Sequence, residues 1–292
     1  MSAEPAPTPS IRTRGTCVTC GATLSGKYCA ACGEKQPGPD DYAFGHFFDG
    51  VIEAFTHADG KIFQSLRLLL TQPGRLTAEF IAGRRKPYLK PLALFLVANT
   101  VFFLALPLIG WDTLTTPLAR HLHNQFYSPL VRAVFERRFP AGRTVPAEFV
   151  REFDTHGALL AKSLVIAMVP LFALVLWAVF ARARRRYLEH VVFALHFYAF
   201  WLFFLVASLG LTTGVVRLLA AGGAKPSDNA IDDVVSLVGL ALLTLYLFHA
   251  VRTVHGGSRP ATLARALVLA VSVGAIMLVY RGFLFLVTYC ML

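Results

Sequence analysis

Five long apolar segments constrain the fold of this 292-residue chain more than any other feature of its sequence. Each approaches or exceeds the roughly 20 residues that a helix needs to cross the hydrocarbon core of a bilayer. Backbone polar groups in a bilayer must bond within the protein, so an apolar segment of this length is expected to span as a helix. The predicted spans are 91–110, 159–181, 190–211, 234–251 and 263–289.

The overall composition points to the same class of protein. Of all residues, 55% are hydrophobic and 15% are charged, whereas a soluble domain carries roughly 25% charged residues. We therefore predict an all-α integral membrane protein with about five transmembrane helices in the domain 91–292. The long segment 111–158 between the first two spans contains amphipathic pieces and is expected to form a small helical cap as an outer loop.

The basic residues, which give the chain a net charge of +11, are grouped between alternate spans. They lie before the first span, between the second and third, and between the fourth and fifth. Membrane proteins keep such segments in the cytoplasm, so we expect a cytoplasmic N-terminus and a C-terminus outside. This accounts for the charge without a nucleic-acid partner. Residues 1–16 have no apolar core of a signal peptide and are interpreted as a disordered tail.

Residues 17–33 form a small cysteine module. Its cysteines, in two C-x2-C pairs, are Cys17, Cys20, Cys29 and Cys32. Four thiolates at this spacing are typical of a tetrahedral structural zinc site. A glycine follows each pair, at Gly21 and Gly33, where a positive φ would turn the backbone toward the sulfur atoms. We predict a zinc ribbon with one structural ion. Two disulfides or free thiols, and an iron–sulfur cluster, are the alternatives.

A polar linker, 34–43, separates the ribbon from amphipathic segments within 44–90. These segments are too polar to span, so we expect cytoplasmic helices along the membrane surface or against the bundle. The polar face of the first one contains His46, Asp49, Glu53 and His57, with Asp59 just beyond. It could hold a second metal ion or an acid–base pair. We favour the alternative, the ordinary polar face of a surface helix.

The region between the ribbon and the first span resembles a known family. After CxxCG…YCxxCG come His57 and Asp59, then Pro73-Gly74, then GRRKPYLKP at 83–91. Over roughly 17–105 this pattern is similar to a bacterial membrane-protein family, domain of unknown function 3667. The resemblance implies a zinc-ribbon protein of the bacterial cytoplasmic (inner) membrane. It brings no activity with it.

The entry into the first span is rich in basic and aromatic residues: Arg84, Arg85, Lys86, Tyr88 and Lys90. Such residues anchor a span at the membrane interface. They could also bind anionic lipid headgroups, so membrane lipids are expected partners.

Polar residues within the predicted spans are the remaining functional candidates. His196 lies in the third span, nearly two turns beyond His190 at its inner end. Arg281 lies toward the outer end of the fifth span, where we expect it to reach outward or to pair with Asp232 or Asp233. The alternative for the histidines is a hydrogen-bonded anchoring role.

The sequence contains no motif that argues for an enzyme: GxSxG, HExxH, Walker A and GxGxxG are all lacking. The leading hypothesis is a non-enzymatic interaction or regulatory protein that docks a protein partner through its cytoplasmic zinc ribbon. The alternative is a small-solute or lipid transporter that uses His196, Asn99 and Arg281 within the bundle. A membrane enzyme ranks third.

Overall fold

The computed structural model describes residues 15–36, 59–110, 114–140, 145–183, 185–223 and 228–292. Within these residues the chain is mainly helical, and the cysteine module has two isolated β-bridges but no strand. Five helices are long and apolar enough to cross a membrane. This confirms the predicted fold class of an all-α membrane protein. The first amphipathic stretch, with His57, and most of the predicted tail and linker lie outside the described residues.

The five candidate spans follow one another along the chain. They are α5 (Pro91–Ile109), α8 (Ala147–Leu164) continued by α9 (Met168–Val179), α10 (Tyr187–Ala221), α11 (Asp228–His255) and α12 (Arg259–Met291). The second begins well before residue 159, so part of the expected outer loop is a continuation of its helix. A 3-10 turn, η2 (Val165–Ala167), joins α8 to α9. Pro170 has no N–H for the carbonyl of Ile166, so the regular α-helical bonding is interrupted beside this turn.

Helix α10 is the centre of the bundle. It packs against α5, α9, α11 and the short helix α4 (Arg75–Ile81). Helix α12 packs against α11, α9 and α8. The apolar side chains of these helices form one large core in which α10 contributes an aromatic cluster, including Phe197 and Tyr198 beside Phe172 of α9. Residues 188–202 of α10 are mostly buried between the neighbouring helices, which explains why this half of the helix has no polar face.

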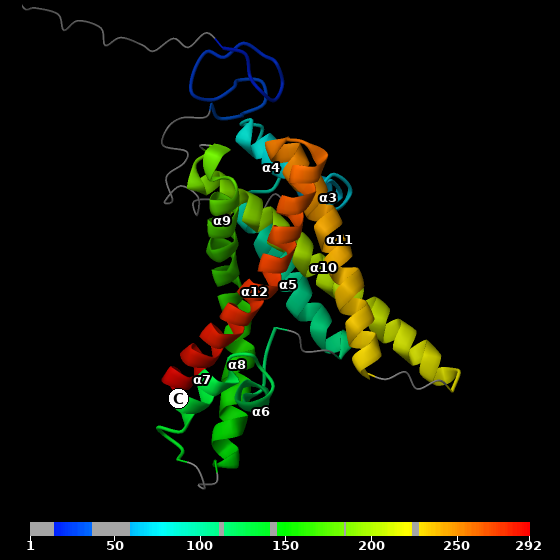
Figure 1. The fold of residues 1–292 in the computed structure, drawn as a ribbon. Helices are drawn as coiled ribbons and strands as arrows, with labels where there is room; N and C mark the ends of the chain where they lie inside the picture. The colour runs from blue at the N-terminus through cyan, green and yellow to red at the C-terminus, as the bar shows by residue number, and fades with distance from the viewer. Residues whose placement is uncertain (1–14, 37–58, 111–113, 141–144, 184, 224–227) are drawn as a thin grey trace, which may run out of the picture.

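A small helical cap covers one pole of the bundle, as the amphipathic pieces of 111–158 predict. It is built from α6 (Leu118–His123), α7 (Ser128–Phe135) and the first part of α8, with the end of α12. Its buried residues are Leu118, Val131, Phe135, Phe149, Phe153 and Phe285. The C-terminus lies at this pole, and the cysteine module lies at the opposite pole (Figure 1).

Two short helices precede the first span, α3 (Asp59–Thr71) and α4. Of the two placements expected for this region, α4 adopts the one against the bundle, because it contacts both α10 and α11. Gly74 has a φ of 80°, and a Cβ there would lie 2.5 Å from the carbonyl oxygen of Ala250 in α11. Position 74 therefore requires glycine for two reasons: the left-handed conformation and the close approach of the two backbones.

The basic connections between spans gather at the pole of the cysteine module. Arg185, in the connection after η3 (Ala181–Ala183), donates from Nη2 to the carbonyl oxygen of Val254 at the end of α11, at 2.9 Å. This bond joins the connection between α9 and α10 to the one between α11 and α12. Figure 1 places both connections, together with α4, beside the cysteine module. The three basic regions therefore share one face of the bundle.

Candidate metal centre

The structure brings the four cysteines of the module together in one cluster. Their sulfur atoms all lie within 4.8 Å of one another, which is close enough to hold a metal ion. The Sγ atoms of Cys17 and Cys32 are 3.6 Å apart, and so are those of Cys20 and Cys29. A tetrahedron with metal–sulfur bonds of about 2.3 Å has sulfur–sulfur edges of about 3.8 Å. The donor set and its spacing therefore fit one tetrahedral ion.

The module consists of two matching turns related by a shift of twelve residues. Cys17 N–H donates to the carbonyl oxygen of Ala22, and Cys29 N–H donates to that of Glu34, both at 2.8 Å. Isolated β-bridges, Thr16 with Thr23 and Tyr28 with Lys35, close the two turns in the same way. Each turn thus presents two thiols on one side, and the two turns face each other across the cluster.

Glycine makes these turns possible at the positions that the sequence predicts. Gly21 has a φ of 76° and Gly33 a φ of 71°. Each donates its backbone N–H to the carbonyl oxygen of the first cysteine of its pair, at 2.9 Å from Gly21 to Cys17 and 2.8 Å from Gly33 to Cys29. Residues with a Cβ rarely adopt this conformation, so both positions favour glycine.

The thiolate is the form of cysteine that binds metals; within this cluster the pKa of Cys29 is lowered, whereas the pKa values of Cys20 and Cys32 are raised. A hydrogen bond from the backbone of Cys32 is the largest influence and lowers the pKa of Cys29 to about 7. Cys17 and Cys29 are buried, whereas Cys20 is exposed. A fifth cysteine, Cys290, lies near the C-terminus at the other pole and has no part in the cluster.

Glu34 connects the metal module to the entry of the first span. Its Oε2 atom accepts hydrogen bonds from Thr19 Oγ1 at 2.8 Å, from the backbone N–H of Lys86 at 2.8 Å and from that of Arg85 at 3.2 Å. The carboxylate is buried, and the Lys86 side chain passes beside Gly33. The second turn of the module is therefore seated on the GRRKPYLKP segment.

Sequence reasoning did not identify Glu34 as a functional residue. It follows the second C-x2-C-G and looks like an ordinary polar linker residue, and its two backbone partners are more than fifty positions away. Backbone donors leave no trace in the residue types that carry them. Only the folded arrangement of module and span entry reveals this contact.

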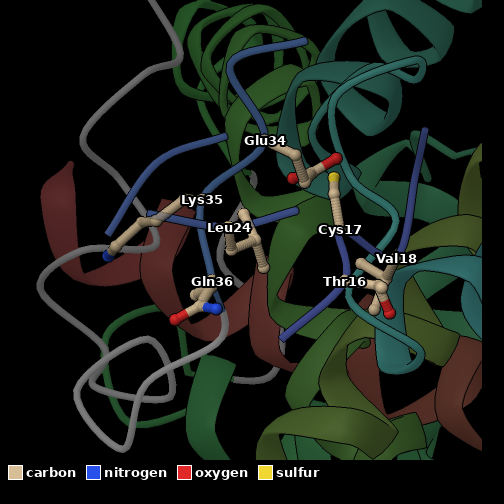
Figure 2. Close-up of a pocket in the computed structure, with 7 residues that line it drawn as sticks. All are labelled: Thr16, Cys17, Val18, Leu24, Glu34, Lys35 and Gln36. Carbon is tan, nitrogen blue, oxygen red and sulfur yellow. The ribbon is translucent and has the colours of Figure 1, made fainter. Parts of the chain in front are cut away.

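A small cavity lies beside the cluster. It has a volume of about 160 Å³ and is lined by Thr16, Cys17, Val18, Leu24, Glu34, Lys35 and Gln36. Figure 2 shows Thr16, Cys17 and Val18 along one side, Lys35 and Gln36 along the other, and Leu24 between them. Val18 and Tyr28 are the large apolar side chains that this module exposes, at 45% and 58%.

Several of the predicted headgroup-binding residues have partners within the protein. Arg84 pairs with the buried carboxylate of Glu79, which Arg75 also contacts at 2.7 Å. The hydrogen bond to Arg84 is the main reason that the pKa of Glu79 lies below its ordinary value. Arg85 lies over the ring of Phe80, 4.3 Å from its centre.

Of the other members of that predicted set, Lys86 lies beside Gly33, Tyr88 packs against the main core, and Lys90 also interacts within the protein. These contacts order the span entry. Lipid binding by Arg84, Arg85, Lys86, Tyr88 and Lys90 stays a prediction.

The polar residues predicted within the spans do not share one site. His196 is buried, and its Nδ1 lies 2.9 Å from Thr77 Oγ1 of α4. Asn99 of α5 donates from Nδ2 to the carbonyl oxygen of Lys162, at 3.0 Å. Arg281 lies near the cap. Burial of His121, and to a smaller extent the charge of Arg281, lower the pKa of His121 to about 4. The three candidate transport residues thus have separate surroundings.

Two other predicted sites are only partly described. Asp59 is the first residue of α3, and its predicted neighbour His57 lies outside the described residues, so a chemical role for the pair stays a prediction. Asp233 is exposed at the start of α11. In Figure 1 that end of α11 runs away from the end of α12 that follows Arg281, which gives the predicted ion pair no support.

Comparison with known proteins gives one match. No curated protein and no solved structure is similar to the chain. Residues 59–103 match the family model described as a protein of unknown function (DUF3667), which confirms the resemblance that the sequence predicts. The matched region begins after the cysteine module and covers α3, α4, the GRRKPYLKP segment and part of α5.

Proposed function

We propose that this chain is a non-enzymatic interaction protein of the bacterial cytoplasmic membrane, with a zinc ribbon that presents a docking surface for a protein partner. The observation that carries the proposal is the attachment of the ribbon to the span entry through Glu34. A ribbon attached in this way holds its exposed face at a defined height above the membrane. A partner that binds this face would be positioned relative to the bundle.

Zinc is the ion that best fits four thiolates in a reducing compartment. Four protein ligands leave no open coordination position, so the proposed role of the ion is structural rather than catalytic. The full chain, purified from membranes, should contain one zinc per chain, and the Cys29→Ser variant should contain much less. Iron in place of zinc, or a mass showing two disulfides, would contradict the assignment.

The cytoplasmic placement rests on the basic connections at the pole of the ribbon. Cys290, exposed near the C-terminus at the other pole, provides a direct test. A membrane-impermeant maleimide should label Cys290 in intact cells and should label the ribbon cysteines only after permeabilisation and chelation. The Cys290→Ser variant is the control that assigns the signal. Labelling of the ribbon cysteines in intact cells would reverse the proposed orientation.

The partner surface consists of Val18, Tyr28 and the neighbouring cavity. The volume of the cavity, about 160 Å³, corresponds to about five water molecules. This is room for one side chain of a partner. A photo-reactive amino acid at Tyr28 of the full chain should give a discrete protein adduct in cells. The same amino acid at Arg182, exposed on the same pole outside the ribbon, should not. Identical adducts from both positions, or an adduct that survives Cys29→Ser, would refute zinc-dependent docking.

A further inference from the structure

Helix α3 has one side attached to the protein. Leu69 is buried in the main core, and its carbonyl oxygen accepts a hydrogen bond from Tyr246 of α11, at 3.2 Å. Ser65 is also buried, and its Oγ accepts the backbone N–H of Leu89, at 2.9 Å. The orientation of α3 about its own axis is therefore determined by contacts with the bundle and with the span entry.

The same contacts determine the height of α3 relative to the membrane. Leu89 lies two residues before the start of α5 at Pro91. A span begins where the chain passes from the headgroup region into hydrocarbon. Because Ser65 bonds to Leu89, the middle of α3 lies level with that transition. In Figure 1, α3 is seen nearly end-on while the spans run down the view, so α3 lies across their axes.

Two large apolar side chains of α3 project from the side that the bundle leaves open. Phe63 is 73% exposed and Leu70 is 53% exposed. They are seven residues apart, which places them on one stripe of the helix. Leu66 lies between them on this side and is half-buried against the core. Arg67 is exposed one turn after Phe63, at the edge of this stripe, and Gln64 is exposed further around the helix.

We infer that α3 is an interfacial anchor, whose stripe of Phe63 and Leu70 inserts into the bilayer leaflet on the side of the cysteine module. A helix that lies at the headgroup level with an apolar stripe and basic residues matches the pattern of surface-bound amphipathic helices. Among the charged residues of α3, one acidic residue, Asp59, is outnumbered by two basic residues, Lys61 and Arg67. Their positive charge complements an anionic lipid surface and argues for a lipid rather than a protein occupant.

Site-specific cross-linking in a defined bilayer tests this inference. The full chain would carry a photo-reactive phenylalanine analogue at Phe63 and be placed in nanodiscs of phosphatidylglycerol and phosphatidylethanolamine. Illumination should add the mass of one phospholipid to peptides that contain position 63. The matched control carries the analogue at Gln64, which points to another side of α3 and should give several-fold less lipid adduct.

Three outcomes would overturn the inference: equal lipid adducts at positions 63 and 64, no lipid adduct at 63, or a cross-link from 63 to a second copy of the chain. If the Phe63 variant is not recovered as folded protein, the analogue at Leu70 makes the same test. The outcome is independent of the proposed docking function, because no partner of the ribbon is present in the nanodisc.

Discussion

Replacement of Glu34 by alanine should release the cysteine module from the span entry without removing its metal. The change deletes three hydrogen bonds, from Thr19 Oγ1 and from the backbone N–H groups of Arg85 and Lys86. The two backbone bonds, from Arg85 and Lys86, are the ones that join the module to the span entry. Each is worth about 0.5–1.5 kcal/mol net, so their loss costs about 2 kcal/mol in total. That shifts the equilibrium between attached and released cysteine module roughly 30-fold toward release.

Hydrogen exchange measured by mass spectrometry gives the readout, because Glu34 shields two specific amides. In the full chain, the peptide that contains Arg85 and Lys86 should exchange much faster in Glu34→Ala than in the wild type. Glu34→Gln should be intermediate, because a neutral acceptor forms weaker bonds than a carboxylate. Glu148→Ala removes an exposed carboxylate of α8 and serves as control. Unchanged exchange at this peptide in Glu34→Ala, with the metal retained, would refute the reasoning.

Three further outcomes are expected. Gly74→Ala should lower the free energy of unfolding of the full chain by at least about 1–2 kcal/mol, the cost of a left-handed residue, and so lower its melting temperature. Gly210→Ala in α10 is the control: a Cβ there meets nothing within 4 Å, so this change should be neutral or stabilising. Thr77→Val should cost about 1–3 kcal/mol by leaving the buried Nδ1 of His196 unpaired, and Thr77→Ser should restore most of it in the same melting assay. The stability of the cap should fall as the pH drops from about 6.5 toward 4. In the unfolded chain His121 takes up a proton near its ordinary pKa, whereas burial holds its pKa in the folded cap at about 4. If the His121→Asn variant had the same pH profile as the wild type, this explanation would be contradicted.

Features that depend on local pattern were predictable from the sequence. The lengths and apolar content of the spans predict helices because the bilayer leaves no other way to satisfy the backbone. The two C-x2-C-G pairs predict the cysteine cluster and the positive φ of Gly21 and Gly33, because metal-ligand spacing and glycine are both local properties. The helical start of the second span segment, at Ala147, was not predicted. Residues of α8 carry charges that resemble a loop, yet Phe149 and Phe153 bury one face of that helix in the cap.

The sequence by itself determined the class of the protein, five apolar helices and one four-cysteine module, since hydrophobic length and ligand spacing act over a few residues at a time. Only the tertiary structure decided how these parts are joined. Glu34 bonds to the backbone of Arg85 and Lys86, Thr77 bonds to His196, and the start of α4 packs closely against Ala250. These contacts link residues far apart in the chain, often through backbone atoms that every residue possesses. Their partners are chosen by the packing of the whole bundle, which no local pattern encodes.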